Sequence, residues 1–288
     1  MSNTRLAIYG LGLIGTSVGL AVRGLLHEWE VWGVDPNASH AAVAYSRGAV
    51  DRIANADEAA DWAEIHLIAA PPRESVALLA SLPFLEGSIV TDTCGIKKPI
   101  ARWMPVLAQR GIRLIPGHPM SGSERSGPSA ADGALFDGAS WLLTPTTTED
   151  PLPASLQAVL MACRAHPVIL SAALHDRYVA AFSQLPHLLA AVVAAVGNTT
   201  AEGDPKAWAF AAGSFRSATR VALSDPQLWS VLAVENRELL LPVVQETQHR
   251  LDRMARLLRE GDESGLLAML QEGQAAKRTL DRATDSDT

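Results

Sequence analysis

The chain lacks the features that mark secreted, nucleic-acid-binding and membrane-spanning proteins. Cys94 and Cys163 are its only cysteines in 288 residues, and they make neither a disulfide framework nor a zinc-ligand pattern. Acidic residues outnumber basic ones by 31 to 24, so no global basic surface attracts nucleic acid or an anionic membrane. The longest apolar runs, such as LLAAVVAAV, are too short to cross a bilayer. No charged segment followed by an apolar one opens the sequence, so we expect a cytoplasmic protein.

What is present is ordinary globular composition. Hydrophobic residues make up 48% of the chain and charged residues 19%, with a mean hydropathy of +0.11. A chain of this length and composition is expected to form two domains with a sizeable buried core.

The first part of the chain alternates short apolar runs with amphipathic stretches. Expected strands lie at 5–10, 30–35, 65–70, 88–93 and 112–117, with helices between them, for instance at 39–49 and 99–111. This alternation predicts an α/β fold with a Rossmann-type, doubly wound parallel sheet. Two further runs, at 140–145 and 166–171, flank a helical stretch at 153–165 and are expected to extend the same sheet.

After about residue 171 the strand pattern stops. Apolar residues recur at three- and four-residue spacing through 172–197, 205–223, 226–258 and 262–281, which predicts four helices. We therefore expect an α/β domain over residues 1–170 and an all-helical domain over 171–288. Such helical domains expose a broad apolar stripe that a two-fold partner can bury, so the expected assembly is a homodimer.

A glycine-rich turn follows the first expected strand. Gly10, Gly12 and Gly15 have the G-x-G-x-x-G spacing that allows a tight turn, close approach of a pyrophosphate and close helix–strand packing. Asp35 ends the second strand, where an acid accepts both ribose hydroxyls and repels a 2′-phosphate. We therefore predict NAD as the cofactor, in preference to NADP. The expected cofactor contacts are Gly10, Gly12, Leu13, Ile14, Gly15 and Asp35.

Several longer motifs occur in one order along residues 5 to 236. They are GLGLIGTS, TDTCGIKKPI, GHPMSGSERSG, LHDRYVAAFSQLPHLLA and GSFRSATRVALSDPQLW. In these motifs the chain resembles the prephenate/arogenate dehydrogenase family of tyrosine biosynthesis. The resemblance implies NAD(P)-dependent oxidative decarboxylation of a cyclohexadienyl acid, without a metal. The activity we predict is the conversion of prephenate to 4-hydroxyphenylpyruvate.

The resemblance also assigns roles to individual residues. His118 corresponds to the base that takes the proton of the ring hydroxyl as hydride departs, and imidazole suits this because its usual pKa lies near neutrality. Pro119 restricts His118 to an extended backbone. Arg220 corresponds to an arginine that can bind a substrate carboxylate bidentately. Ser123 and His187 correspond to positions that contact substrate.

Other positions are interpreted differently. His175 and Asp176 lie at the start of a predicted helix, where a negative charge complements the helix dipole, and are read as structural. Trp229 could line the site, but a tryptophan among packed helices is more often a core residue and is read as one. Cys94 is read as a small buried hydrophobe. Gly95 departs from the family pattern, because many members have a serine there that also reaches the ring hydroxyl.

Other functions share some of these sequence features. Arogenate differs from prephenate by one amino group, and no residue here reads that group unambiguously. Gly95 raises the alternative of 4-amino-4-deoxyprephenate as substrate. A β-hydroxyacid dehydrogenase shares the two-domain plan, but the catalytic lysine expected early in its helical domain is missing from LHDRYVAAFSQLPH. A non-enzymatic NAD-sensing protein would not need His118, His187 and Arg220 together.

Overall fold

The computed structural model describes residues 4–122 and 125–285 of the chain. Its contacts divide the chain into two compact units, Met1–Arg237 and Glu238–Thr288. The domain boundary expected after residue 170 lies inside the first unit, just after its last strand, and stays a prediction.

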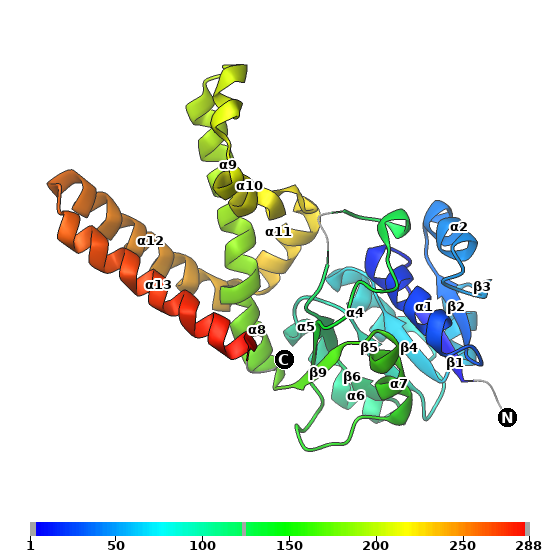
Figure 1. The fold of residues 1–288 in the computed structure, drawn as a ribbon. Helices are drawn as coiled ribbons and strands as arrows, with labels where there is room; N and C mark the ends of the chain where they lie inside the picture. The colour runs from blue at the N-terminus through cyan, green and yellow to red at the C-terminus, as the bar shows by residue number, and fades with distance from the viewer. Residues whose placement is uncertain (1–3, 123–124, 286–288) are drawn as a thin grey trace. The chain divides into compact units, whose positions relative to one another are not determined.

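A six-stranded sheet forms the centre of the first unit (Figure 1). Its order is β3-β2-β1-β4-β5-β6, and every pairing in it is parallel. The order reverses between β1 and β4, which is the arrangement of a doubly wound Rossmann-type sheet. This confirms the predicted fold class. The strands are β1 (Arg5–Tyr9), β2 (Glu30–Val34), β3 (Arg52–Ile53), β4 (Ile65–Ile68), β5 (Ile89–Asp92) and β6 (Arg113–Ile115).

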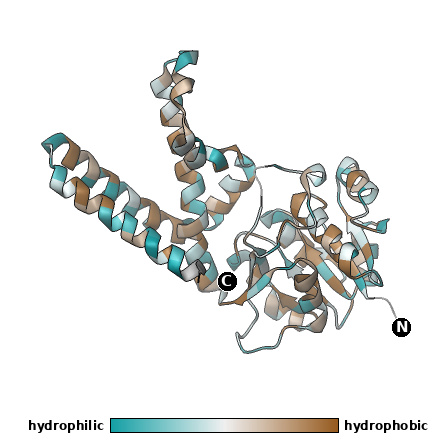
Figure 2. Cartoon of the chain, in the orientation of Figure 1, coloured by the Kyte–Doolittle hydropathy of each residue, from teal (hydrophilic) through white to brown (hydrophobic). Residues whose placement is uncertain are grey.

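Helices cover both faces of this sheet because successive side chains of each strand point to opposite faces. In β1, Leu6 and Ile8 join one buried cluster, whereas Ala7 and Tyr9 join the other. The first cluster includes residues of α1 (Leu13–Leu25), α2 (Ala38–Ser46) and α7 (Ala154–Ala162). The second includes residues of α3 (Ala56–Trp62), α4 (Pro72–Ser81), α5 (Lys98–Ala101) and α6 (Met104–Ala108). Figure 2 shows hydrophobic residues along the strands between these helices.

The last strands of the α/β part do not extend this sheet, so that expectation was wrong. They form a second sheet, in which β8 (Ser140–Leu143) lies between β7 (Gly117–Pro119) and β9 (His166–Ile169). Pro116 separates β6 from β7 and has no amide to donate to a ladder. The next amide, of Gly117, donates to Asp92 Oδ1 at 3.0 Å instead of to a strand. The chain therefore leaves the large sheet, and β7 pairs with β8 in antiparallel fashion.

The predicted helical region begins as one continuous helix. It consists of α8 (Ala172–Val179), a π-helical turn η2 (Ala180–Gln184) and α9 (Leu185–Ala201). The π turn ends just before Pro186, the second residue of α9 and the residue for which we expect a kink. Two predicted helices are interrupted. The 205–223 stretch forms α10 (Gly213–Thr219) between the 3-10 turns η3 (Pro205–Phe210) and η4 (Arg220–Leu223).

The predicted 226–258 helix breaks at Asn236, between α11 (Pro226–Glu235) and α12 (Arg237–Glu260). The Asn236 side chain donates to the Asp176 carbonyl and to Gln184 Oε1, both at 2.9 Å. These tertiary hydrogen bonds stabilise the break, which the apolar spacing alone does not reveal.

The stretch Ala172–Ala201 corrects our estimate of the longest apolar run. An 18-residue window within this 30-residue helical stretch has a mean hydropathy of 1.8, enough by length and composition to cross a membrane. The stretch is this long because the π turn joins α8 and α9 into one continuous helix. This is weak evidence for a membrane, since a core helix gives the same result. The same helix also contains His175 and Asp176, both buried and hydrogen-bonded.

The second unit is an antiparallel pair of helices, the remainder of α12 and α13 (Glu263–Asp285). Gly261 makes the turn with a φ of 65°. Asp262 caps α13 by accepting the Gly265 amide at 2.9 Å. Further along, Arg250 donates to Glu272 at 3.2 Å, so the two helices run side by side.

Candidate active site

The glycine turn has the geometry that a dinucleotide site requires. Gly10 has a φ of +97°, and a Cβ on it would lie 2.5 Å from the Ala69 carbonyl oxygen. A Cβ on Gly15 would lie 1.9 Å from the Gly10 carbonyl oxygen. By contrast, a Cβ on Gly12 would meet no described atom within 4 Å. The backbone thus requires glycine at two positions, and the third leaves the turn open to a ligand.

Helix α1 starts at this open position. Gly12 is its N-cap and has no side chain that could accept the free amides of the first turn. Those amides and the helix dipole favour a phosphate there. Leu13 and Ile14 are half-buried, and Ile14 packs against the core, so the contact expected from Ile14 would come from its amide. The residues present therefore fit a dinucleotide pyrophosphate.

Asp35 follows β2 and reaches back to the glycine turn. Its Oδ2 accepts the Leu11 amide at 2.7 Å, and its Oδ1 accepts the Asn37 amide at 2.8 Å. The Asp35 side chain is 8% exposed, and His40 Nδ1 lies 3.9 Å from its Oδ2. Each carboxylate oxygen keeps further acceptor capacity, so the group fits ribose hydroxyls. Its contact with a cofactor stays a prediction.

His118 lies at the same edge of the sheet as the glycine turn. The turn follows β1, Gly95 follows β5, and His118 follows β6, all at the carboxyl ends of parallel strands. Asp35 follows β2, on the other side of the strand-order reversal. A dinucleotide bound across this switch point would extend from Asp35 towards the side of the sheet that holds His118.

Two buried polar side chains, His175 and Asp176, form a hydrogen-bonded chain that ends at Nδ1 of His118. His118 Nδ1 lies 2.9 Å from His175 Nε2, and His175 Nδ1 lies 2.7 Å from Asp176 Oδ1. Asp176 also accepts the amides of Lys97 and Lys98, each at 2.7 Å. Helix α8 supplies His175 and Asp176, β7 supplies His118, and the start of α5 supplies the amides.

Burial lowers the pKa of both histidines. For His118 the pKa lies well below its usual value, first because of burial and then because of His175 and the Lys97 ammonium. Burial likewise lowers the pKa of His175, although its hydrogen bond to Asp176 acts in the opposite direction. Both rings are therefore neutral near pH 7. A neutral imidazole that is only half-buried, as His118 is, is suited to accept a proton from a bound ligand.

The Lys97 side chain connects the loop that carries His118 to the sheet. Its ammonium group donates to Asp92 Oδ2 at 2.6 Å and also to the Gly117 carbonyl oxygen, and both ionic side chains are fully buried. Asp92 in turn accepts the amides of Cys94 and Gly117. The backbone on either side of the site is thus held by one buried ion pair.

The free side of the His118 ring faces Gly95. A Cβ on Gly95 would lie 3.7 Å from His118 Nε2 and 3.4 Å from the Leu232 side chain. Position 95 is therefore next to His118, and glycine leaves it without a hydroxyl. Cys94 is buried and its thiol pKa is raised to about 12, chiefly by burial, which agrees with a packing role.

His187 and Arg220 lie together on the helical side of the first unit. The His187 ring stacks on Trp229 with centroids 3.4 Å apart, and its Nδ1 lies 3.0 Å from the Ser183 carbonyl oxygen. Burial lowers the pKa of His187, the Ser183 carbonyl opposes this, and the Arg220 charge lowers it further. Trp229 thus contacts a predicted site residue, beyond the core role expected for it.

Helix α11 connects His187 and Trp229 with the surroundings of His118. Trp229 and Leu232 are three residues apart on α11 and so share a face. Trp229 touches His187, whereas Leu232 lies beside Gly95. The structure therefore brings His118, His187 and Arg220 to one region. Ser123, the remaining predicted substrate contact, lies outside the described residues.

Sequence reasoning did not identify the parts played by His175, Asp176 and Lys97. The helix-dipole interpretation of Asp176 was incomplete, since the carboxylate accepts amides from the start of α5. The only sign in the sequence of the role of His175 and Asp176 was that a histidine and an aspartate stand next to each other in a predicted helix. That signal does not say which distant groups they meet.

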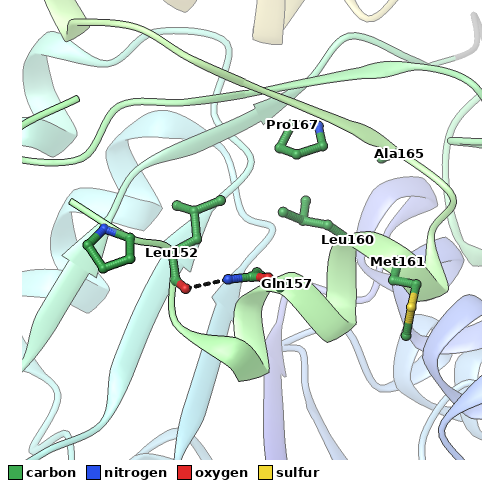
Figure 3. A pocket seen from close by; sticks show the side chains of 7 residues that line it. Leu152, Gln157, Leu160, Met161, Ala165 and Pro167 are labelled. Carbon is green, nitrogen blue, oxygen red and sulfur yellow. Dashed lines mark hydrogen bonds between the residues drawn. The ribbon is translucent and has the colours of Figure 1, made fainter. Parts of the chain in front are cut away.

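A cavity of about 490 Å³ lies elsewhere, between α7 and β9 (Figure 3). The Gln157 side chain lines the cavity and donates to the Leu152 carbonyl at 2.6 Å. Its described lining has no titratable side chain, so it offers no acid–base chemistry. It is lined by Pro151, Leu152, Gln157, Leu160, Met161, Ala165 and Pro167.

Two family models match the chain. One, described as "Prephenate dehydrogenase, nucleotide-binding domain", matches residues 18–169. The other, described as "Prephenate dehydrogenase, dimerization domain", matches residues 171–272. The prephenate dehydrogenase of Lactococcus lactis subsp. cremoris is 30% identical to the chain over 281 residues, which cover 96% of this chain and 77% of that protein.

Solved structures resemble the chain over its whole length. Prephenate dehydrogenase from Aquifex aeolicus, in complex with hydroxyphenyl propionate and NAD+, superposes with a TM-score of 0.85 at 24% identity, over 97% of this chain and 99% of that one. At that identity the likeness concerns the fold. Synechocystis arogenate dehydrogenase superposes with a TM-score of 0.73 at 27% identity, over 96% and 100%.

Proposed function

Because the chain belongs to the prephenate dehydrogenase family, we propose that it oxidises and decarboxylates prephenate to 4-hydroxyphenylpyruvate with NAD. Family membership makes it an oxidoreductase with a nicotinamide dinucleotide cofactor. The choices of prephenate, of NAD and of His118 as base are our proposal. The observation that carries it is the neutral imidazole of His118, backed by His175 and Asp176 at the carboxyl edge of the Rossmann-type sheet.

The cofactor preference rests on Asp35. Its carboxylate lies beside the glycine turn, held by two backbone amides, and would repel the 2′-phosphate of NADP. When bound, NAD supplies the acceptor for the hydride that leaves the ring carbon bearing the hydroxyl. Gly10, Gly12, Gly15 and the first-turn amides of α1 would hold its pyrophosphate.

The side chains of this protein manage the charges of the substrate. His118 takes the hydroxyl proton at Nε2, so that a carbonyl can form as hydride departs. Arg220 binds a carboxylate of the substrate, and His187, stacked on Trp229, lines the same region. Carbon dioxide then leaves from the opposite ring carbon, and formation of an aromatic ring supplies much of the driving force. The main contribution of the protein is therefore positioning.

Arogenate is the main alternative substrate, since it has the same ring and differs by one amino group. The resemblance to the Synechocystis arogenate dehydrogenase supports testing it beside prephenate. Glycine at position 95 supports testing 4-amino-4-deoxyprephenate as well, because the residue next to the proposed base has no hydroxyl for a ring oxygen.

Steady-state kinetics with these three substrates and both cofactors test the proposal. We expect prephenate with NAD to give the highest kcat/KM, and His118→Asn to lower kcat by about a hundredfold or more. His249→Asn, an exposed histidine of α12, is the matched control. Full turnover by His118→Asn would contradict its role as base. Cofactor binding without turnover of any cyclohexadienyl acid would favour an NAD-sensing protein.

We also propose that the protein is a homodimer in the cytoplasm. Only 22% of the apolar window in Ala172–Ala201 is buried within the chain, and α12 and α13 expose leucines such as Leu251, Leu258, Leu267 and Leu270. A second copy can bury this surface. Both cysteines are unpaired and buried, as a reducing compartment favours. Sedimentation should give twice 30.6 kDa for wild type, and smaller species for Leu258→Glu combined with Leu267→Glu.

A further inference from the structure

We propose that His175 and Asp176 are positioning residues that fix the ring tautomer of His118, so that its Nε2 carries a lone pair and not a proton. The proposal deepens the proposed function, since it explains how His118 is kept ready as a base. It rests on the direction in which each hydrogen bond of a buried three-residue chain must run.

The direction is set at the Asp176 end. A backbone amide can only donate, and Asp176 accepts two of them, from Lys97 at Oδ1 and from Lys98 at Oδ2. Both carboxylate oxygens therefore act as acceptors. His175 Nδ1 lies 2.7 Å from the same Oδ1, so this nitrogen must carry the proton of that bond.

The second bond follows from the first. Burial lowers the pKa of His175, so its ring is neutral near pH 7 and has a single N–H, which is at Nδ1. Its Nε2 is then an acceptor. His118 Nδ1 lies 2.9 Å from it and must donate. The neutral ring of His118 consequently has its only proton at Nδ1.

The lone pair of His118 Nε2 lies on the side of the ring that faces Gly95. Nε2 is 3.7 Å from the position of a Cβ on Gly95, where no side chain lies. The charged groups that face the two rings are the Lys97 ammonium, which is paired with Asp92, and Asp176. Without an acceptor at Nδ1, the ring proton of His118 would be free to move to Nε2 and block the base.

The arrangement also helps once His118 has accepted a proton. The imidazolium keeps its Nδ1–H bond to His175, whose own Nδ1–H bond ends on the Asp176 carboxylate. The new positive charge thus faces a fixed negative charge across one intervening ring. This is the role that a carboxylate has behind the histidine of hydrolase triads, here with one more imidazole between them.

Nitrogen-15 NMR of the histidine rings tests the tautomers directly. The full-length wild-type protein, labelled in histidine and held at pH 8, should show protonated Nδ1 and unprotonated Nε2 for both His118 and His175. His118→Asn and His175→Gln assign the two rings by loss of their signals. A proton on Nε2 of either ring overturns the proposal. This result does not depend on turnover, so it is separate from the test of the proposed function.

Kinetics of two His175 variants test the consequence for the reaction. Glutamine can place an amide oxygen near the position of Nε2 and accept from His118 Nδ1, whereas leucine cannot. We expect His175→Gln to keep kcat within about tenfold of wild type, and His175→Leu to lower it about a hundredfold, with KM for prephenate nearly unchanged in both. In His175→Leu, the His118 ring should also show protonated Nε2.

Each result has a defined meaning. Equal kcat for the two variants, with the His118 tautomer unchanged in both, overturns the proposal. If His175→Leu does not fold, as circular dichroism and NAD binding would reveal, the wild-type NMR result decides. If wild type turns over no cyclohexadienyl acid but shows the expected tautomers, the proposed function fails while the positioning role of His175 and Asp176 stands.

Discussion

At the scale of single residues, Asp35 is expected to decide the cofactor. Its carboxylate accepts the Leu11 amide beside the glycine turn, so its negative charge is fixed where a ribose would bind. We predict that Asp35→Asn lowers kcat/KM for NAD by about tenfold or more, since hydrogen bonds to a charged group contribute about 1.5–3 kcal/mol. The kcat/KM for NADP should rise relative to that for NAD, because the repulsion of its phosphate is removed.

The measurement is steady-state kinetics with varied cofactor at saturating substrate. Asp61→Asn removes an exposed carboxylate from α3 and is the matched control for loss of one negative charge. An unchanged ratio of kcat/KM for the two cofactors in Asp35→Asn would show that other groups choose between them.

Gly95 is the second position at which one side chain should change activity. A Cβ there makes only ordinary contacts, 3.4 Å from Leu232 and 3.7 Å from His118 Nε2. We predict that Gly95→Ala changes kcat little. With prephenate, the kcat of Gly95→Ser should exceed the kcat of Gly95→Ala by about two- to tenfold, because a neutral hydrogen bond to the ring hydroxyl contributes about 0.5–1.5 kcal/mol.

The alanine variant controls for the added volume, so the comparison isolates the hydroxyl group. Lower kcat in Gly95→Ser than in Gly95→Ala, with both variants folded, would mean that the reacting ring group is not placed beside position 95.

At the scale of elements, the Lys97–Asp92 pair joins β5, α5 and β7. Both side chains are fully buried, and Lys97 also donates to the Gly117 carbonyl. We predict that Lys97→Met lowers the free energy of unfolding by about 3–5 kcal/mol, because it leaves a buried carboxylate without its partner. The double variant Asp92→Leu with Lys97→Met should lose less than Lys97→Met alone. Urea denaturation measures all three free energies.

Lys206→Met is the control for loss of one lysine, since Lys206 is an exposed residue of η3. A double variant less stable than Lys97→Met would show that Asp92 stabilises the loop mainly through the amides of Cys94 and Gly117.

At the scale of the whole molecule, buried histidines should make the fold sensitive to acid. Burial lowers the pKa of His66 from 6.5 to about 3, and it also lowers those of His118 and His175. Between pH 6.5 and 3 the unfolded chain therefore binds more protons than the folded one. The stabilisation is complete above pH 6.5 and is lost as the pH falls. For His66 the loss is about 1.4 kcal/mol per pH unit between pH 6.5 and 3.

Denaturant titrations at pH 7, 6, 5 and 4 test this dependence. His66→Phe should lower the slope of unfolding free energy against pH by the amount that one buried histidine contributes. His249→Phe is the control for loss of an exposed imidazole. Equal slopes in wild type and His66→Phe would show that His66 does not remain neutral in the folded protein.

Much of the architecture was predictable because it follows from local periodicity. Five of the six parallel strands, all but the short β3, were expected from their apolar runs, and the helices of the second half from three- and four-residue spacing. The second sheet was not expected, because Pro116 and the Gly117–Asp92 hydrogen bond redirect the chain after β6. The break at Asn236 also depends on partners far away in the sequence.

The sequence by itself determined the Rossmann-type fold, the glycine turn, the family, and the histidine proposed as base. These features depend on residue type at fixed short spacing, which a chain displays before it folds. Only the tertiary structure decided which groups contact the Nδ1 side of that histidine. They are His175 and then Asp176, which lie 57 and 58 residues further along the chain, and Asp176 in turn accepts two amides at the start of α5. The direction of a hydrogen bond depends on which groups meet, and folding alone brings these together.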